Sequence, residues 1–287
     1  MRITHNYDWL VTGLLVVLAA ATGMGQPAST ADATDLAQRQ VTAYLAKLAD
    51  LHCTESVVQE KLSTSGHVEA SEKAKYDYLI MMDGDDNDFQ LNESRIESTA
   101  SKHKALPMLV TNGFSTLLLV FHPYYRDSFT FAMEGEQQVN GRPAVGIKFA
   151  HIPGGRTPAA LALRGREYPL DLEGTAWLDK ETGEVVKIDA SLLHDMSDVG
   201  LRSINVHVEY KAETLGGRSA KMTLPSLAVV DVTTPRQHWR NTHIFEGYKS
   251  FSTDAEQDPN VKIRASSAAM GHDNTASIET NSPKEKP

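Results

Sequence analysis

Polar and apolar positions alternate along most of the chain with the two-residue period of half-buried β-strands. The alternation is clearest in 201–212, where Ile204, Val206, Val208 and Tyr210 are separated by polar residues. Similar stretches predict further strands over 54–62, 75–82, 89–98, 128–137, 144–150, 175–178, 185–190, 227–233 and 243–251. Turn residues separate successive stretches, so neighbours along the chain are expected to pair as antiparallel hairpins.

Helical spacing interrupts this pattern in two places. In 35–50, apolar residues recur at helical spacing after Asp35, which can form a capping box with Gln38. This stretch predicts one amphipathic helix. The second place is 113–122 (GFSTLLLVFH), which predicts a short buried helix capped by Ser115. A buried strand is the alternative for the same apolar run.

Together these elements predict a single domain over 35–251 with a mainly β (α+β) fold. We expect a curved antiparallel sheet or unclosed half-barrel of about nine to eleven strands, with an N-terminal helix and a helical lid or plug. The segment 151–172 is rich in Gly, Pro and Arg, and it predicts a long surface loop with one short helical turn. The segment 252–287 has few hydrophobic residues and predicts a disordered tail.

The first 25 residues have the layout of a secretory signal peptide, with a short polar start, an apolar stretch over 9–21 and small residues after it. Cleavage is expected near Gly23 or Gly25, followed by a polar linker over 26–34. An uncleaved anchor is the alternative, although the apolar stretch is shorter than the ~20 residues that span a bilayer. The chain is therefore expected to be soluble, periplasmic or secreted, and not an integral membrane protein.

Charge and cysteine content narrow the function further. The 287 residues include 28 Lys and Arg against 37 Asp and Glu, which gives a net charge of -9. This balance argues against a protein that binds nucleic acid or anionic lipid through overall charge. The single cysteine, Cys53, excludes a disulfide framework and cysteine-based metal sites. We expect a buried, inert thiol there, with a reactive thiol or an intermolecular disulfide as alternatives.

Three segments carry a resemblance to a known superfamily. They are the helix at 35–50 that runs into DLHCTESVVQEKL, the hairpin GTAWLDKETGEVVKIDASL at 174–192, and the closing strand NTHIFEGYKSF at 241–251. With the export signal, they resemble the outer-membrane lipoprotein-sorting (LolA/LolB-like) superfamily of exported bacterial proteins. The resemblance implies an unclosed antiparallel barrel, lidded by helices, that binds acyl chains or hydrophobic protein segments. It assigns no ligand contact residue by residue.

Motifs for catalysis and metal binding are incomplete. The segment 83–88 (DGDDND) opens like a calcium loop, but Asp88 and Ser94 stand where Gly and Glu are needed, so an acidic turn is expected. His238 and His243 have a spacing that suits a metal site on neither a helix nor a strand. We therefore expect no enzyme, no metal and no cofactor. An esterase-like enzyme is a minor alternative, which needs a Ser, a His and an acid to converge.

Charged residues also occur inside the predicted strands. Glu93 and Arg95 share one face of the strand at 89–98. Charged residues of this kind are most often exposed to solvent. A buried ion pair or a carbohydrate site is the alternative.

The strongest candidate site is apolar and aromatic, and its predicted residues are Phe114, Leu117, Leu118, Phe121, Tyr124 and Trp177. The plain structural interpretation is a helix that fills the core. The functional interpretation is the lid or floor of a hydrophobic trough, in an exported carrier or chaperone for a lipid, an acyl chain or a lipidated protein.

The alternative function is a non-catalytic sensor or interaction module that docks an envelope protein. Its surface would consist of the 151–172 loop and the 236–243 segment, with Arg236, His238, Trp239 and Arg240 as the contact residues. Arg and Trp are the residue types that dominate interface energies.

Overall fold

The computed structural model describes residues 29–48, 51–83, 90–97, 109–111, 113–163, 166–215, 221–250 and 276–280. The predicted signal peptide, 1–25, lies outside the described residues. The helices are α1 (Thr30–Leu48), η1 (Phe114–Phe121), α2 (Pro123–Arg126) and η2 (Ser197–Val199). The strands are β1 (Leu51–Leu62), β2 (Val68–Asp83), β3 (Gln90–Glu97), β4 (Leu109–Thr111), β5 (Phe129–Val139), β6 (Arg142–His151), β7 (Ala159–Leu163), β8 (Arg166–Pro169), β9 (Leu172–Asp179), β10 (Val185–Leu192), β11 (Ser203–Thr214), β12 (Lys221–Thr233), β13 (His238–Ser250) and β14 (Ala276–Thr280).

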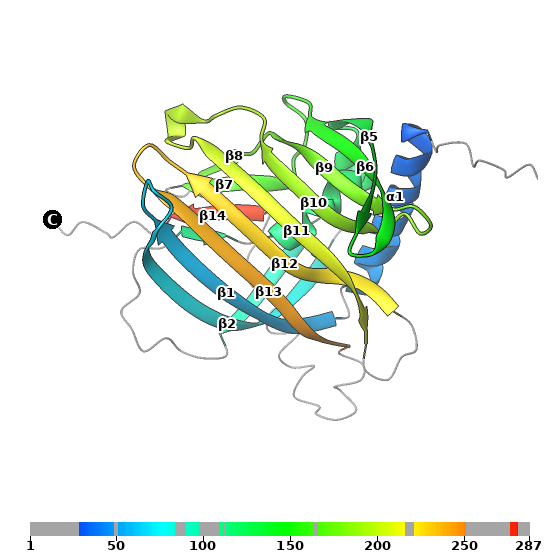
Figure 1. Cartoon of the computed structure of the whole chain (residues 1–287), viewed down its shortest axis with the longest axis horizontal. Helices are drawn as coiled ribbons and strands as arrows, with labels where there is room; N and C mark the ends of the chain where they lie inside the picture. The colour runs from blue at the N-terminus through cyan, green and yellow to red at the C-terminus, as the bar shows by residue number, and fades with distance from the viewer. Residues whose placement is uncertain are drawn as a thin grey trace, which may run out of the picture.

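Ten of these strands form one sheet in the order β3-β2-β1-β13-β12-β11-β10-β9-β6-β5. Every neighbouring pair is antiparallel, and the edge strands β3 and β5 do not pair with each other, so the sheet is unclosed. The sheet lies in front of η1 and the short strands β7 and β14, with α1 at one end (Figure 1). The predicted fold class is therefore confirmed.

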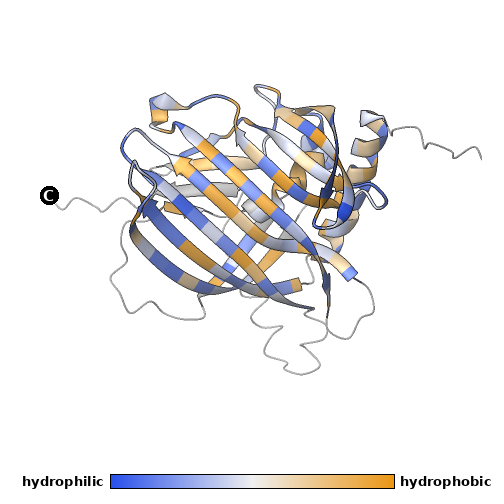
Figure 2. Ribbon diagram, viewed as in Figure 1, coloured by the Kyte–Doolittle hydropathy of each residue, from blue (hydrophilic) through white to orange (hydrophobic). Residues whose placement is uncertain are grey.

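Alternation along each strand gives the sheet one apolar and one polar face, as the banded ribbons of Figure 2 show. In β11 the four residues predicted from the sequence, Ile204, Val206, Val208 and Tyr210, are all buried on the inner face. The hairpin between β5 and β6 turns at Asn140 and Gly141, both with positive φ, as an Asn-Gly turn requires.

The prediction of a long surface loop over 151–172 is wrong. This stretch contains β7 and β8, which belong to a second, four-stranded sheet in the order β4-β14-β7-β8. The apolar run of β7 buries Ala159 and Leu161, and that burial outweighs the turn-forming composition around it. Within the predicted tail, Ala276–Thr280 form β14 between β4 and β7, and the rest of 252–287 lies outside the described residues.

Helix α1 begins at Thr30, inside the predicted linker. The reason is a cap earlier than Asp35: the Asp32 N–H donates to Ser29 Oγ at 3.1 Å, and the Ser29 N–H donates back to the Asp32 carboxylate at 3.3 Å. None of the helices that the structure describes is long and apolar enough to cross a membrane.

The predicted helix at 113–122 is present as the 3₁₀ helix η1, which is interrupted at Thr116. Its cap is Gly113, whose φ of 74° is in the left-handed region, and not Ser115 as predicted. Ser115 is the second residue of η1, where its hydroxyl contacts buried polar side chains. Three leucines, Val120 and Phe121 of η1 are buried, so the segment fills the inner side of the sheet.

Helix α1 buries Ala33, Ala37, Val41, Leu45 and Leu48 in the main core, and two further contacts join it to neighbouring elements. The Arg126 guanidinium forms an ion pair with Asp35 at 2.6 Å and donates a hydrogen bond to Gln38. Leu36 packs on the turn between β9 and β10, where a Cβ on Gly183 would lie 2.3 Å from Leu36 Cγ.

We predict that Gly183→Ala destabilises the protein by about 1–3 kcal/mol more than Gly200→Ala, because only the first also overpacks a neighbour. Both glycines have positive φ, 74° and 80°, so the backbone strain of alanine is matched. Urea unfolding of the two variants measures the difference. Equal losses would show that α1 does not dock on the β9–β10 turn.

Candidate ligand-binding site on the inner face of the sheet

The structure brings together four of the six residues predicted to line the trough. Leu117, Leu118 and Phe121 lie in η1 and are at most 3% exposed, and Phe114 is the first residue of η1. Tyr124, in α2, packs against the same core and carries the Arg156 guanidinium 4.4 Å above its ring. We call β4 and η1, with residues 109–111 and 113–121, the inner segment.

Trp177 does not join this group, which corrects the prediction. Its neighbours Ala176 and Leu178 point into the main core, so Trp177 points to the outer face of β9. There it packs beside Val186, and its ring covers Gly146, whose added Cβ would lie 2.8 Å from it. One residue of register separates the two faces of a strand.

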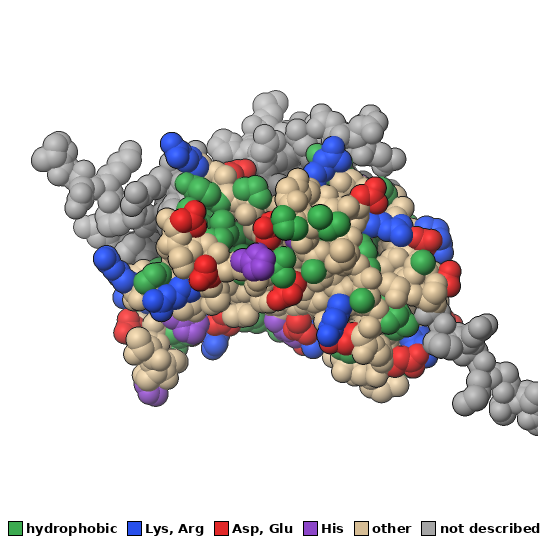
Figure 3. Space-filling model, turned by 90° about the horizontal axis from the view of Figure 1, so that it is seen from above, with side chains coloured by type: hydrophobic (Ala, Val, Ile, Leu, Met, Phe, Trp, Pro, Cys, Tyr) green, Lys and Arg blue, Asp and Glu red, His purple; other side chains and the backbone are tan. Residues whose placement is uncertain are grey.

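Beyond the small apolar cluster around Trp177, the outer face is polar. A shallow hollow of about 580 Å³ crosses β9 to β12, and Figure 3 shows it between two projecting parts of the surface. Asp189 binds Lys187 at 2.7 Å and His207 at 2.6 Å within it. Charged groups paired in this way suit water better than an acyl chain.

The structure places only part of the 236–243 segment at the surface. Residues 238–243 belong to β13, whose inner face holds Trp239, 8% exposed, together with His243. His238 and Arg240 point outward and both bind Asp231, at 2.9 and 3.2 Å. Of the four predicted contact residues, Trp239 is thus buried and Arg236 is exposed, and in 151–172 the exposed turn at 152–156 leads into β7.

A buried carboxylate holds the start of η1. Glu93 Oε2 accepts a hydrogen bond from the Gly113 N–H at 2.7 Å, and its Oε1 accepts one from the Tyr78 hydroxyl at 2.5 Å. Ser115 Oγ lies 2.8 Å from the same hydroxyl oxygen. The Tyr210 hydroxyl donates to the Ser115 carbonyl at 2.9 Å, so polar groups from β2, β3 and β11 converge on one turn.

A second buried carboxylate, Glu55, lies on the inner face of β1. The Arg95 side chain donates to both of its oxygens, at 2.5 and 2.8 Å, and His243 Nδ1 lies 2.8 Å from Oε1. Arg95 also lies 3.8 Å from Glu93, so one guanidinium serves both carboxylates. These contacts settle the open question about Glu93 and Arg95: they form a buried ion pair and not solvated charges.

The same network reaches β4. His243 Nε2 lies 2.7 Å from Thr111 Oγ1, which accepts a hydrogen bond from the Asn241 amide at 3.0 Å. Asn241 and Gln59 both donate to the Leu109 carbonyl, at 2.7 and 2.8 Å. The inner segment is therefore attached to the sheet by hydrogen bonds along β4 and at the first turn of η1.

Electrostatics within the network follow from burial and pairing. Burial alone would raise the pKa of Glu55, but Arg95 and the hydrogen bond from His243 outweigh it, so the pKa lies below its ordinary value. Burial raises the pKa of Tyr78 well above its ordinary value, and the charge of Glu93 adds to this. The hydroxyl consequently remains a hydrogen-bond donor at neutral pH.

Cys53 lies beside this network on the inner face of β1 and is buried. Burial raises the pKa of its thiol to about 12, so the thiol remains protonated. The prediction of a buried, inert thiol is confirmed. Among the described residues, no group of three or more His, Cys, Asp or Glu is placed to hold a metal ion.

Sequence reasoning missed Glu55, Asn241 and His243. The two-residue period of β1 indicates that Glu55 is buried, because Glu55 lies on the same face of the strand as the buried Leu51, Cys53 and Val57. A polar residue at an inward position of a strand indicates a buried partner. The identity of the partner depends on the pairing of distant strands.

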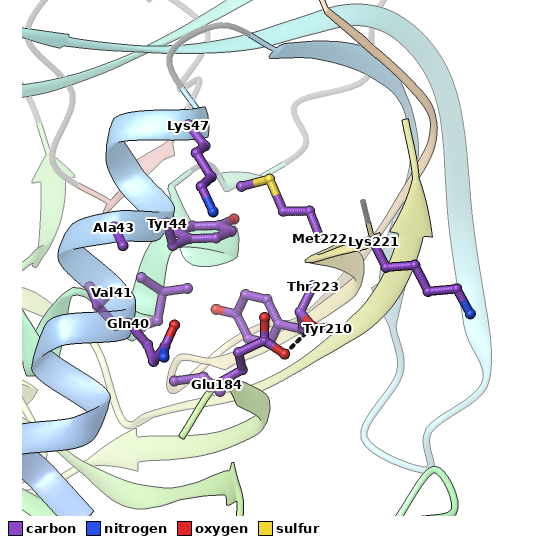
Figure 4. Close-up of a pocket in the computed structure, with 12 residues that line it drawn as sticks. Gln40, Val41, Ala43, Tyr44, Lys47, Glu184, Tyr210, Lys221, Met222 and Thr223 are labelled. Carbon is purple, nitrogen blue, oxygen red and sulfur yellow. Dashed lines mark hydrogen bonds between the residues drawn. The ribbon is translucent and has the colours of Figure 1, made fainter. Parts of the chain in front are cut away.

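A cavity of about 60 Å³ lies between α1 and the sheet (Figure 4). Its lining residues are Gln40, Val41, Ala43, Tyr44, Lys47, Leu118, Glu184, Val185, Tyr210, Lys221, Met222 and Thr223. For comparison, a cavity of roughly 150 Å³ holds one benzene molecule. The space is therefore too small for an acyl chain while η1 occupies the inner face.

Comparison with solved structures finds distant structural matches. A putative outer membrane lipoprotein-sorting protein domain from Vibrio parahaemolyticus matches with a TM-score of 0.42 and 10% identity, over 81% of this chain and 97% of that one. A DUF1329 family protein from Desulfovibrio piger matches with a TM-score of 0.41 and 13% identity, over 77% and 93%. A LolA superfamily protein from Nitrosomonas europaea matches with a TM-score of 0.37 and 8% identity, over 78% and 94%.

The chain is similar in structure to LolA-superfamily proteins. The similarity is one of structure, at low sequence identity. No protein-family model matches the sequence, and no curated protein matches it.

We predict that Arg95→Met destabilises the protein by about 3–5 kcal/mol, because it leaves Glu55 and Glu93 buried without their cation. Lys148→Met is the matched control, since the Lys148 side chain is 59% exposed where it binds Glu134. It is expected to change stability by at most about 0.5 kcal/mol. Urea unfolding at neutral pH compares them, and a similar small loss in both would contradict the buried network.

We predict that the lowered pKa of Glu55 contributes stability above its ordinary value of 4.5, and that this contribution is lost as the pH falls through the lower folded-state value. Glu55→Gln is therefore expected to lose less stability than the wild type between pH 6 and pH 3. Glu69→Gln, at an exposed ion pair with Lys61, serves as the control and should follow the wild type. Urea midpoints across this pH range are the measurement, and parallel curves for all three proteins would contradict the prediction.

Proposed function

We propose that this protein is an exported, non-catalytic carrier or chaperone that binds the apolar part of a lipid, an acyl chain or a lipidated protein on the inner face of the sheet. The observation that carries the proposal is the covering of this face. Over β10, β11 and β12 the unclosed sheet is covered by the apolar η1. Such a face becomes a hydrophobic binding surface wherever the covering segment moves aside.

The helix η1 is suited to being displaced. Runs of 3₁₀ helix longer than three or four residues are uncommon, because their hydrogen bonds are poorly aligned. In η1 the run is further broken at Thr116, which has non-helical backbone angles. Leu117, Leu118 and Phe121 contribute only apolar surface, and an acyl chain could replace that surface at about 0.8 kcal/mol per buried methylene.

Helix α1 supplies the route to this face. It forms one wall of the cavity, and Leu118 of η1 forms part of the cavity lining. Among the residues that the structure describes, the polar contacts between α1 and α2 are those of Arg126 with Asp35 and Gln38. Movement of α1 away from the sheet would enlarge the existing cavity toward η1.

Export completes the proposal. We infer from the signal-like N-terminus that the protein acts in the periplasm or outside the cell, where a soluble carrier would move apolar cargo through water. The buried position of Trp239 and the strands in 151–172 remove part of the surface expected for the partner-docking alternative.

We predict that the neutral fluorescent probe N-phenyl-1-naphthylamine binds the protein, and that Arg126→Gln and Leu118→Ala each increase its binding several-fold. The first variant loosens α1, and the second enlarges the cavity. Trp177→Ala is the matched control, because it removes an aromatic side chain from the outer face.

Fluorescence titration of the wild type and the three variants measures this. The proposal is contradicted if no variant binds the probe, or if Trp177→Ala changes binding as much as the inner-face variants. Circular dichroism of each variant verifies that the sheet is intact.

A further inference from the structure

We infer that the cavity between α1 and the sheet binds the anionic head group of a single-chain amphiphile, with the Tyr44 hydroxyl and the Lys47 ammonium as its ligands. This inference rests on the proposed function and names the chemical class of the cargo. The chain of the amphiphile would continue along the inner face in the space of η1.

The first observation is an unsatisfied donor. The Tyr44 hydroxyl is buried and has no hydrogen-bond partner, although its residue lines the cavity. A buried polar group without a partner costs about 1–3 kcal/mol, so such groups are uncommon in native proteins. Burial holds the pKa of Tyr44 well above its ordinary value, and the hydroxyl therefore remains able to donate.

The second observation is a cation beside it. Figure 4 shows the Lys47 side chain extending from the last turn of α1 toward the Tyr44 ring. Lys47 has no ion-pair partner among the residues that the structure describes. It also lies in the last turn of α1, where a lysine offsets the partial negative charge of the helix C-terminus.

Glu184, on the opposite wall of the cavity, is paired with other residues and not with Tyr44 or Lys47. Glu184 accepts hydrogen bonds from Thr223 at 2.8 Å and from Arg142 at 3.1 Å. Its side chain is thus held on the far side of the cavity, as the dashed line in Figure 4 indicates.

The donor set selects the head group. An ammonium has three donors and no acceptor, and here the Tyr44 hydroxyl supplies another donor. A carboxylate offers acceptors alone, and charge-assisted hydrogen bonds are about twice as strong as neutral ones. The apolar side chains of Val41, Leu118 and Met222 line the same cavity and would contact the first methylenes.

The test is isothermal titration calorimetry of the full chain with sodium laurate and with 1-dodecanol, which share a chain and differ in the head group. We expect the wild type to bind laurate about tenfold more tightly, a difference of about 1.4 kcal/mol. Lys47→Met and Tyr44→Phe should each reduce this preference. Lys221→Met should keep it, because Lys221 lines the same cavity but points away from it in Figure 4.

The outcomes separate the two proposals. Equal binding of laurate and dodecanol by the wild type overturns the head-group site and leaves the carrier in place. A laurate preference that Lys221→Met reduces as much as Lys47→Met also overturns the site, because it indicates a general effect of charge. Binding of neither compound, by the wild type or by Leu118→Ala, overturns both proposals.

Discussion

The buried pair of Glu55 and Arg95 is the interaction on which the inner side of this molecule depends. A buried carboxylate is tolerated only when its charge is paired and its oxygens accept hydrogen bonds. Here one guanidinium serves Glu55 and Glu93. Glu55 also contacts His243, and Glu93 accepts hydrogen bonds from the Tyr78 hydroxyl and from the Gly113 N–H at the start of the inner segment. Apolar packing is non-directional, so these hydrogen bonds fix where η1 lies.

This arrangement divides the inner segment into two parts with different chemistry. Its start, up to Ser115, is anchored by directional polar contacts, whereas Leu117 to Phe121 contribute apolar surface only. A ligand that replaces the second part can leave the first in place, because the two parts meet at the irregular Thr116. The polar anchor would then return η1 to the same position after release.

Much of the fold could be predicted from the sequence, because period-two alternation and turn residues are local signals. The β11 pattern and the Asn140-Gly141 turn are correct to the residue. Trp177 was misplaced because β9 is apolar on both faces at that point, with Val186 packing on the outside. Large apolar residues do not by themselves reveal which face is the core.

The rest of the site could not be predicted from local pattern. Glu55, Arg95 and His243 come from β1, β3 and β13, and they meet only because β1 pairs with β13 on one side and with β2 on the other. The composition of 151–172 predicts a loop, but β7 pairs in parallel with β14, which is far along the chain. Contacts of this kind follow from topology and not from spacing.

The most direct test of the central claim, that the inner face binds a hydrophobic cargo, is native mass spectrometry of the mature protein purified from its own cell envelope. The cargo proposal predicts a population heavier than the polypeptide, with a lipid or acylated species released on denaturation. A clean polypeptide mass, unchanged after incubation with laurate, would contradict the proposal and leave η1 as an ordinary part of the core.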